Sequence, residues 1–159
     1  MPGRKILIVD YESRSLDALA RLFERHKFEI VKASDGLSAY EKFRVERPDI
    51  IVLEAILPKL HGFDLTSRIR LESKGAVPVV IVTGLYRGSQ YRHEALTSFG
   101  ASAYFEKPYK EEDLVRTVLG LLKEKVEIGL TLPRPDAVAA FLANQLKRTQ
   151  EAAKSRTDN

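Results

Sequence analysis

The sequence predicts a doubly wound α/β fold with a five-stranded parallel sheet in the order 2-1-3-4-5. Short runs of aliphatic and β-branched residues alternate five times with stretches in which apolar residues recur at helical spacing. The aliphatic runs lack polar alternation, which is typical of strands covered on both faces. Each helical crossover must return the chain to the same edge of the sheet with right-handed sense, and five such units favour this strand order.

The first two units lie in residues 6–47. Ile6–Val9 predicts a central strand, and Ser13 is expected to cap the helix that follows. The apolar positions expected on the inner face of that helix are Leu16, Leu19, Ala20 and Phe23. A second strand is expected at 28–32. Asp35 then opens a second helix, and its expected inward residues are Leu37, Tyr40 and Phe43.

The other three units occupy residues 49–125. The expected elements are a strand at 49–53, a helix bearing Phe63, Leu65 and Ile69, a strand at 77–82, a helix at 89–99, a strand at 103–105 and a helix at 111–125. Gly75 and Gly100 end the two middle helices, because glycine readily adopts the left-handed conformation that terminates a helix. The last helix is expected to bury Leu114, Val118, Leu121 and Leu122.

After the domain at 1–125 the pattern changes. Residues 126–135 contain Gly129, Pro133 and Pro135, which indicates a connector. A further helix is expected at 136–152 and a flexible polar tail at 153–159. The apolar stripe of that helix consists of Val138, Phe141, Leu142 and Leu146. It needs a surface to cover it: the domain itself, a second copy in a homodimer, or another protein.

Composition narrows the class of protein. The 159 residues are enough for one domain with a sizeable core. The net charge is 26 − 22 = +4, with basic residues scattered among acidic ones, so nucleic acid is not an expected partner. The absence of cysteine excludes disulfides and thiolate metal sites. Ile6–Val9 is too short for a signal peptide or a membrane span, so we expect a cytoplasmic protein that does not insert into a membrane.

Polar side chains follow the predicted strands where these end. Asp10 follows the first strand, Glu54 the third, Thr83 the fourth and Lys107 the fifth. The carboxyl ends of parallel strands meet at one edge of a sheet, and the switch point of this order lies between strands one and three. Asp10 and Glu54 are therefore expected to meet there.

Five segments at the right intervals resemble the receiver domain of bacterial response regulators over residues 4 to about 125. They are 6–10, 48–54, 57–63, 78–83 and 100–108. The resemblance implies a flavodoxin-like signalling module that is not an enzyme. In that family an acidic pair after strand one and an aspartate after strand three hold Mg²⁺, and the aspartate accepts a phosphoryl group from a histidine kinase. A hydroxyl residue after strand four and a lysine before a cis-proline contact that group.

The chain keeps part of this pattern. Asp10 matches the first acid, Thr83 the hydroxyl, Lys107 and Pro108 the Lys-Pro pair, and Tyr104 the aromatic switch residue. Two positions depart: Tyr11 stands at the second acidic position and Glu54 at the phosphoacceptor position. The resemblance also implies a partner face bordered by Arg87, Arg92, Tyr104, Lys107 and Tyr109. The alternative for that face is an ordinary charged surface.

The departures predict a changed pocket. A neutral phenol is a poor ligand for Mg²⁺, so we expect no cofactor and weak or absent Mg²⁺ binding, with Tyr11 packing over the vacated position. Lys107 could instead bridge Asp10 and Glu54. Glutamate extends about 1.5 Å beyond aspartate, and a displacement of ~1 Å can slow phosphoryl transfer roughly 10²-fold. We expect no useful phosphorylation.

Two classes of function follow. The first is a phosphorylation-independent adaptor whose partner is a signalling protein, such as a kinase or a polarity or motility protein; Glu54 could partly mimic a phosphorylated aspartate by drawing in Thr83 and Lys107. The second is a working phosphoacceptor with reduced Mg²⁺-dependent transfer. A flavin carrier is disfavoured because residues 11–15 lack a glycine-rich phosphate loop. The three histidines, His26, His61 and His93, lack metal-like spacing and are expected at the surface.

Overall fold

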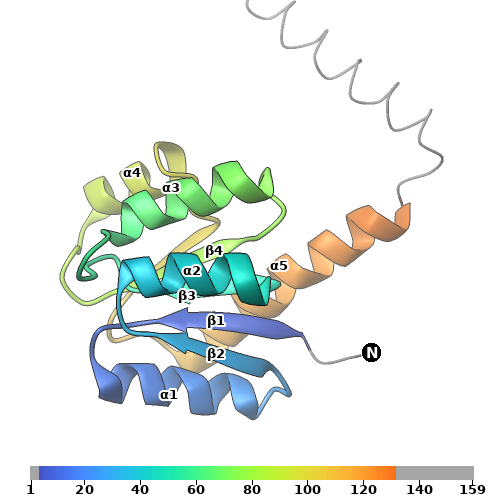
Figure 1. The fold of residues 1–159 in the computed structure, drawn as a ribbon, viewed down its shortest axis with the longest axis horizontal. Coiled ribbons are helices and arrows are strands. Elements are labelled where there is room, and N and C mark those ends of the chain that lie inside the picture. Colours follow the sequence, from blue (N-terminus) through green and yellow to red (C-terminus); the bar gives the residue numbers. More distant parts are fainter. Residues whose placement is uncertain (1–3, 132–159) are drawn as a thin grey trace, which may run out of the picture. The chain divides into compact units, whose positions relative to one another are not determined.

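The predicted sheet is present with the predicted topology. A computed structural model describes the backbone of residues 4–131 and the side chains of residues 4–124. The elements are β1 (Lys5–Val9), α1 (Ser13–Glu24), β2 (Glu29–Ala33), α2 (Gly36–Glu46), β3 (Ile50–Leu53), α3 (Gly62–Ser73), β4 (Val79–Thr83), α4 (Ser89–Thr97), β5 (Ala103–Glu106) and α5 (Glu111–Thr131). The strands of this part run parallel in the order β2-β1-β3-β4-β5, which confirms the predicted order (Figure 1).

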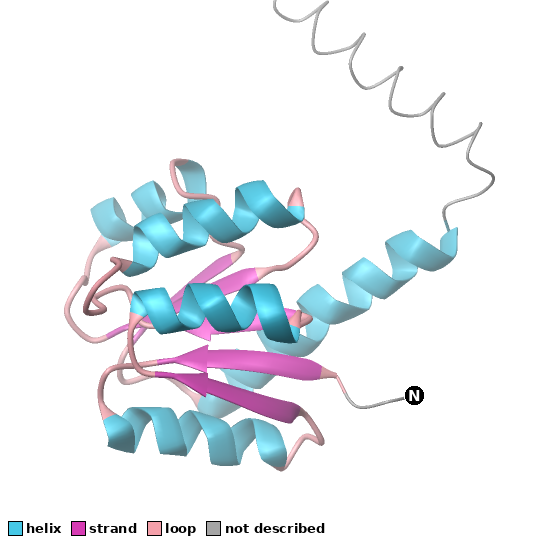
Figure 2. Ribbon diagram, viewed as in Figure 1, coloured by secondary structure: helices cyan, strands magenta, loops and turns pink. Residues whose placement is uncertain are grey.

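Helices cover both faces of the sheet (Figure 2). Ile6 and Ile8 of β1 pack into a core beneath α1 and α5, whereas Leu7 and Val9 pack into a core beneath α2, α3 and α4. Alternate side chains of a strand point to opposite faces, so a central strand must be apolar at every position. This explains the unbroken aliphatic runs in the sequence.

Two local expectations near the first helices are wrong. Ser13 is the first residue of α1 and not its cap; Glu12 precedes the helix and makes no side-chain capping bond. Leu37 is 45% exposed, because the buried face of α2 is formed by Gly36, Ala39 and Phe43 and Leu37 lies to one side of it. Asp35 does cap α2, since its carboxylate accepts a hydrogen bond from the Ser38 amide at 2.7 Å.

The last helix is longer than the sequence suggested. The backbone of α5 remains helical to Thr131. Residues 126–131, expected to begin a connector, are therefore helical. A single glycine costs only about 1 kcal/mol relative to alanine within a helix, so Gly129 does not have to end α5. The expected connector at 132–135, helix at 136–152, tail at 153–159 and homodimer contact lie outside the described residues.

Membrane insertion was not expected from the sequence. Among the described residues, no helix is both long and apolar enough to cross a bilayer.

Candidate functional site

Asp10 and Glu54 lie at the same edge of the sheet, as the strand order requires. β1 and β3 are neighbours, with Val9 paired to Leu53, so the residue after each strand reaches the same place. The Glu54 amide also donates a hydrogen bond to the Val9 carbonyl at 2.9 Å. Both carboxylates are buried, with Asp10 1% and Glu54 3% exposed. The topology has thus brought two acids together in the interior.

Lys107 joins these two acids. Its Nζ lies 2.9 Å from Oδ2 of Asp10 and 3.0 Å from Oε2 of Glu54. The Lys107 backbone amide donates to the Thr83 carbonyl at 2.8 Å, and the peptide bond to Pro108 is cis. Burial lowers the pKa of Lys107, but the hydrogen bonds that its ammonium donates to both carboxylates outweigh this, and the net shift is upward. Lys107 is therefore a charged bridge between the strand ends.

The other carboxylate oxygens are bound by the backbone. Oδ1 of Asp10 accepts from the Glu12 amide at 2.9 Å, and Oε1 of Glu54 accepts from the Ala55 amide at 3.0 Å. No buried side-chain nitrogen or oxygen lacks a hydrogen-bond partner within the described side chains. The acidic pocket is satisfied by protein groups alone.

Tyr11 stands beside the pocket and remains accessible. Tyr11 is 42% exposed, so more than half of its surface is covered by the rest of the domain. The pKa of Tyr11 is raised, first by partial burial and then by negative charges that include Glu12, Glu54 and Asp10. The phenol therefore lies close enough to the carboxylates for their charges to affect its pKa, and it is also accessible to solvent.

Thr83 and Tyr104 are tied to the loop after β4. Oγ1 of Thr83 is buried and accepts hydrogen bonds from the amides of Leu85 and Tyr86, both at 3.3 Å. Tyr104 is only 3% exposed, and its hydroxyl donates to the Tyr86 carbonyl. Burial is the main reason that the pKa of Tyr104 is raised to about 12. In the described part of the chain, Glu54 thus forms an ion pair with Lys107 but no hydrogen bond with the Thr83 hydroxyl.

Sequence reasoning missed the aromatic group that holds this loop. Nε2 of His61 lies 3.2 Å from the Tyr86 hydroxyl, and Nδ1 of His61 accepts from the Phe63 amide at 3.1 Å. The Tyr86 ring stacks on Tyr91 with centroids 4.6 Å apart. His61 was expected at the surface and is half-buried instead; His26 and His93 are exposed as expected. No local pattern links positions 61 and 86, because only the fold brings them together.

The residues expected to border a partner face lie in different surroundings. Arg87 and Arg92 are exposed, and the Arg87 guanidinium donates to the Lys107 carbonyl. Arg92 and Tyr104 line one hollow with Glu106. Tyr109 packs instead against the core beneath α1 and α5, with its ring 6.4 Å from that of Phe105. Burial raises the pKa of Tyr109. Tyr109 and Tyr104 therefore belong to cores on opposite faces of the sheet.

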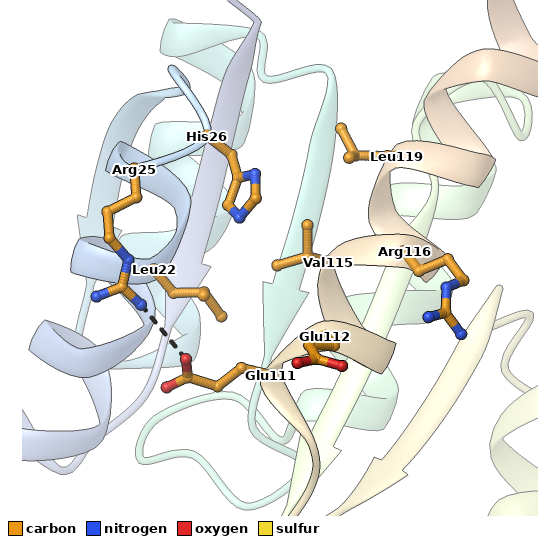
Figure 3. Close-up of a pocket in the computed structure, with 8 residues that line it drawn as sticks. All are labelled: Leu22, Arg25, His26, Glu111, Glu112, Val115, Arg116 and Leu119. Atoms are coloured by element: carbon orange, nitrogen blue, oxygen red, sulfur yellow. Dashed lines mark hydrogen bonds and ion pairs between the residues drawn. The ribbon is translucent and has the colours of Figure 1, made fainter.

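A separate hollow lies between α1 and α5 (Figure 3). Leu22 and Val115 supply apolar surface, and Arg25 forms an ion pair with Glu111 at 3.3 Å across it. None of the strand-end residues Asp10, Glu54 and Lys107 lines it. It is thus distinct from the acidic pocket.

The sheet has the order 2-1-3-4-5, and its carboxyl edge carries an acid, a hydroxyl and a Lys-Pro pair. We compared the chain with known proteins that share these features. A family model described as the response regulator receiver domain matches residues 6–119. The chain belongs to this family. As a receiver, it is a module of two-component signalling, a class of proteins that works with signalling partners such as kinases.

Relatives of this receiver differ in length. Protein PilH of Pseudomonas aeruginosa is 30% identical over 119 residues, which cover 74% of this chain and 97% of PilH. The alkaline phosphatase synthesis transcriptional regulatory protein PhoP of Bacillus subtilis is 31% identical over 121 residues, which cover 76% of this chain and 49% of PhoP. The chain thus spans about half the length of some curated relatives, PhoP among them, and nearly all of PilH.

Solved structures agree with the fold. A response regulator receiver domain protein from Clostridium thermocellum aligns with a TM-score of 0.71 at 26% identity, covering 79% of this chain and 98% of that protein. A LuxR-family two-component response regulator from Aurantimonas aligns with a TM-score of 0.69 at 31% identity, covering 77% and 86%.

Proposed function

We propose that this receiver signals through protein–protein contact without accepting a phosphoryl group. The observation that supports this most strongly is the ion pair of Lys107 with both Asp10 and Glu54, at 2.9 and 3.0 Å. In the family pattern the lysine contacts the phosphoryl group. Here the carboxylate at the phosphoacceptor position already occupies it.

The donor set of the pocket does not suit Mg²⁺. This ion requires near-octahedral oxygen coordination, and the family pattern provides three carboxylates for it. Asp10 and Glu54 provide two, each with one oxygen bound to the Lys107 ammonium and the other to a backbone amide. Tyr11 offers a neutral, partly exposed phenol in place of the third acid. A dication would have to displace Lys107 from both carboxylates.

The side-chain length of Glu54 also opposes transfer. Phosphoryl transfer depends on placing the attacking oxygen in line with the leaving group and on neutralising charge. A glutamate displaces that oxygen by about 1.5 Å relative to an aspartate, which is enough to cost orders of magnitude in rate. We propose that the module is not an enzyme and that it acts in the cytoplasm on a kinase, polarity or motility protein.

The inward position of Tyr104 favours a second, compatible proposal: that Glu54 partly mimics a phosphorylated aspartate. Tyr104 is buried and bonded to the Tyr86 carbonyl, as expected of the switch residue in the signalling-active arrangement. Glu54 engages Lys107 but not Thr83, so the mimicry is incomplete. One carboxylate also carries less charge than a phosphate and fewer acceptor oxygens.

Incubation with a small phosphodonor and Mg²⁺, followed by intact-mass measurement, tests the main proposal. The wild-type chain is expected to remain unmodified. A matched variant, Tyr11→Asp with Glu54→Asp, restores the family's acids and is expected to gain the mass of one phosphoryl group, about 80 Da. A wild-type adduct at Glu54 would instead favour the alternative, a working phosphoacceptor with reduced transfer.

A further inference from the structure

The outer surface of α2 and α3 carries an unusual group of cations. The guanidinium carbons of Arg44, on α2, and Arg68, on α3, lie 5.7 and 5.6 Å from the centre of the Tyr40 ring. Both distances are within the range of cation–π contact. The charges of the two arginines lower the pKa of Tyr40, although its hydrogen bond to Glu72 is the largest influence and the net shift is upward. Two positive charges therefore share one aromatic ring.

These arginines lack acidic partners. In the described part of the chain, neither Arg44 nor Arg68 has a carboxylate oxygen within 4.0 Å, and neither does Arg47 at the end of α2. Glu72 is nearby, but its carboxylate accepts the hydrogen bond of the Tyr40 hydroxyl. The three side chains are exposed. They form a surface with unmatched positive charge.

Apolar groups accompany the charge. Val45 on α2 is 80% exposed and Leu71 on α3 is 75% exposed, and both point away from the core. A hollow at the ends of the two helices is lined by Phe43, Arg44, Arg47, Pro48, Glu72, Ser73 and Val77. Isolated exposed aliphatic residues are common, but these two occur on the same pair of helices as the hollow and the unpaired arginines, which suggests a contact surface.

We propose that this arginine surface, formed by Tyr40, Arg44, Val45, Arg47, Arg68 and Leu71, docks an acidic segment of a partner protein that also presents apolar side chains. Carboxylates of such a segment would form the ion pairs that the arginines lack, and arginine is well suited to bidentate recognition of carboxylates. Apolar side chains of the segment would cover Val45 and Leu71. Arginine next to an aromatic ring is also typical of interface hot spots.

Other occupants fit less well. A second copy related by twofold symmetry would place the same arginines opposite one another, and like charges across an interface are unfavourable. Nucleic acid or an anionic lipid surface would satisfy the charges. Neither would make use of the apolar residues Phe43, Pro48 and Val77 that line the hollow.

The surface is independent of the acidic pocket. Pro48 and Val77, which line the hollow, precede β3 and β4, whereas Glu54 and Thr83 lie at the opposite ends of these strands. The inference therefore goes beyond the proposed function and holds whether or not Glu54 accepts phosphate.

Site-specific photocrosslinking in the cells that produce the protein tests the proposal. The full chain carries p-benzoylphenylalanine in place of Leu71, or of Glu24 on exposed α1 as a control, and the crosslinked peptide is sequenced by mass spectrometry. The expected adduct at position 71 is a segment in which carboxylates and apolar residues share one face. Its yield is expected to fall at least about tenfold with Arg44→Gln and Arg68→Gln together, since hydrogen bonds to charged groups are strong.

The matched control, Arg14→Gln with Arg21→Gln, removes the same charge from α1 and is expected to leave the yield unchanged. Circular dichroism checks that each variant is folded, and the single variants Arg44→Gln and Arg68→Gln, each expected to lose part of the yield, replace the double variant if it unfolds. The proposal is overturned if position 71 yields no adduct above the control, or if the adduct is nucleic acid, lipid, a second copy or a segment without acids. An adduct insensitive to the arginine variants overturns it too.

Discussion

Lys107 lies between Asp10 and Glu54, with its ammonium nitrogen 2.9 Å from one carboxylate and 3.0 Å from the other. The three side chains come from the ends of β5, β1 and β3, so a single cation ties three strands together at one edge of the sheet. The local charge of the group is −1. Its stability therefore depends on the lysine remaining protonated and in place.

Lys107→Met is expected to destabilise the fold by about 3 kcal/mol at pH 7, because it leaves two buried carboxylates without their cation. Urea unfolding followed by circular dichroism measures the change. Adding Glu54→Gln to the variant removes one of the opposed charges and should recover part of the loss. Lys27→Met, at an exposed position, is the control and should change stability little. Equal stability of Lys107→Met and wild type would show that the bridge contributes nothing.

The contribution of the Lys107 bridge to folding stability is expected to depend on pH. Because the folded-state pKa of Lys107 is raised, its contribution is fully present below pH 10.5 and is lost as the pH rises through the folded value. The stability advantage of wild type over Lys107→Met should accordingly stay constant from pH 7 to 9 and shrink above 10.5. Urea midpoints measured for both proteins across this range test it. An advantage that grew with pH would contradict the assignment.

Ionisation of Tyr104 is expected to lower the stability of the fold further at alkaline pH. Its folded pKa of about 12 exceeds the ordinary value of 10.0, so between these values the unfolded chain releases the phenol proton first and becomes favoured. Wild-type stability should fall in this range by about 1.4 kcal/mol per pH unit more than that of Tyr104→Phe. At pH 7 the variant should lose about 1 kcal/mol through the missing bond to Tyr86. If the stability of wild type and of Tyr104→Phe fell equally with pH, the Tyr104 phenol would have an ordinary pKa and would not be buried.

Magnesium should distinguish the native pocket from a restored one. Wild-type thermal stability is expected to be unchanged by Mg²⁺. The variant Tyr11→Asp with Glu54→Asp should gain about 1.4 kcal/mol at ten times its dissociation constant. Calcium and high sodium chloride serve as controls for general ionic effects. Saturable Mg²⁺ stabilisation of the wild type that is abolished by Asp10→Asn would reveal a metal site after all.

Gly62 is expected to be essential for the backbone beside Glu54. An added Cβ would lie 2.4 Å from the Glu54 carbonyl oxygen and 2.6 Å from that of Ala55, both of them backbone atoms. Gly62→Ala should therefore destabilise by about 2 kcal/mol or more. The contrast is Gly120→Ala in α5, where a Cβ meets nothing within 4 Å and helix propensity should add about 0.8 kcal/mol. Chemical denaturation measures the free energy of unfolding of both variants. If Gly62→Ala left it unchanged, the backbone of the loop after β3 would be able to move away from the added methyl group at little cost.

Much of the site followed from strand order. Asp10 and Glu54 are 44 positions apart in the sequence, yet their meeting could be inferred because parallel strands place their carboxyl ends at one edge. The Lys107 bridge was one of several arrangements open to these charges. Its selection depended on where the tertiary structure places Lys107, whose backbone amide donates to the Thr83 carbonyl.

The expectations that failed concern contacts between elements. Helical spacing suggested that Leu37 points inward, but Gly36 approaches Leu60 so closely that a Cβ would lie 2.0 Å from its carbonyl oxygen, and this contact orients α2. His61 was predicted to lie at the surface, but in the structure the loop after β4 places Tyr86 against it. The helical backbone of α5 continues through Gly129, which the sequence analysis had placed in a connector at 126–135.

By itself, then, the sequence determined the α/β class, the strand order and which residues stand at the strand ends, because hydrophobic periodicity and the handedness of crossovers act along the chain. Only the tertiary structure decided that Lys107 neutralises Glu54, that Tyr104 lies inward against the Tyr86 carbonyl and that Arg44 and Arg68 share one ring. The physical reason is that ion pairs and ring contacts depend on distances of a few ångströms between residues far apart in the chain, and packing alone sets those distances.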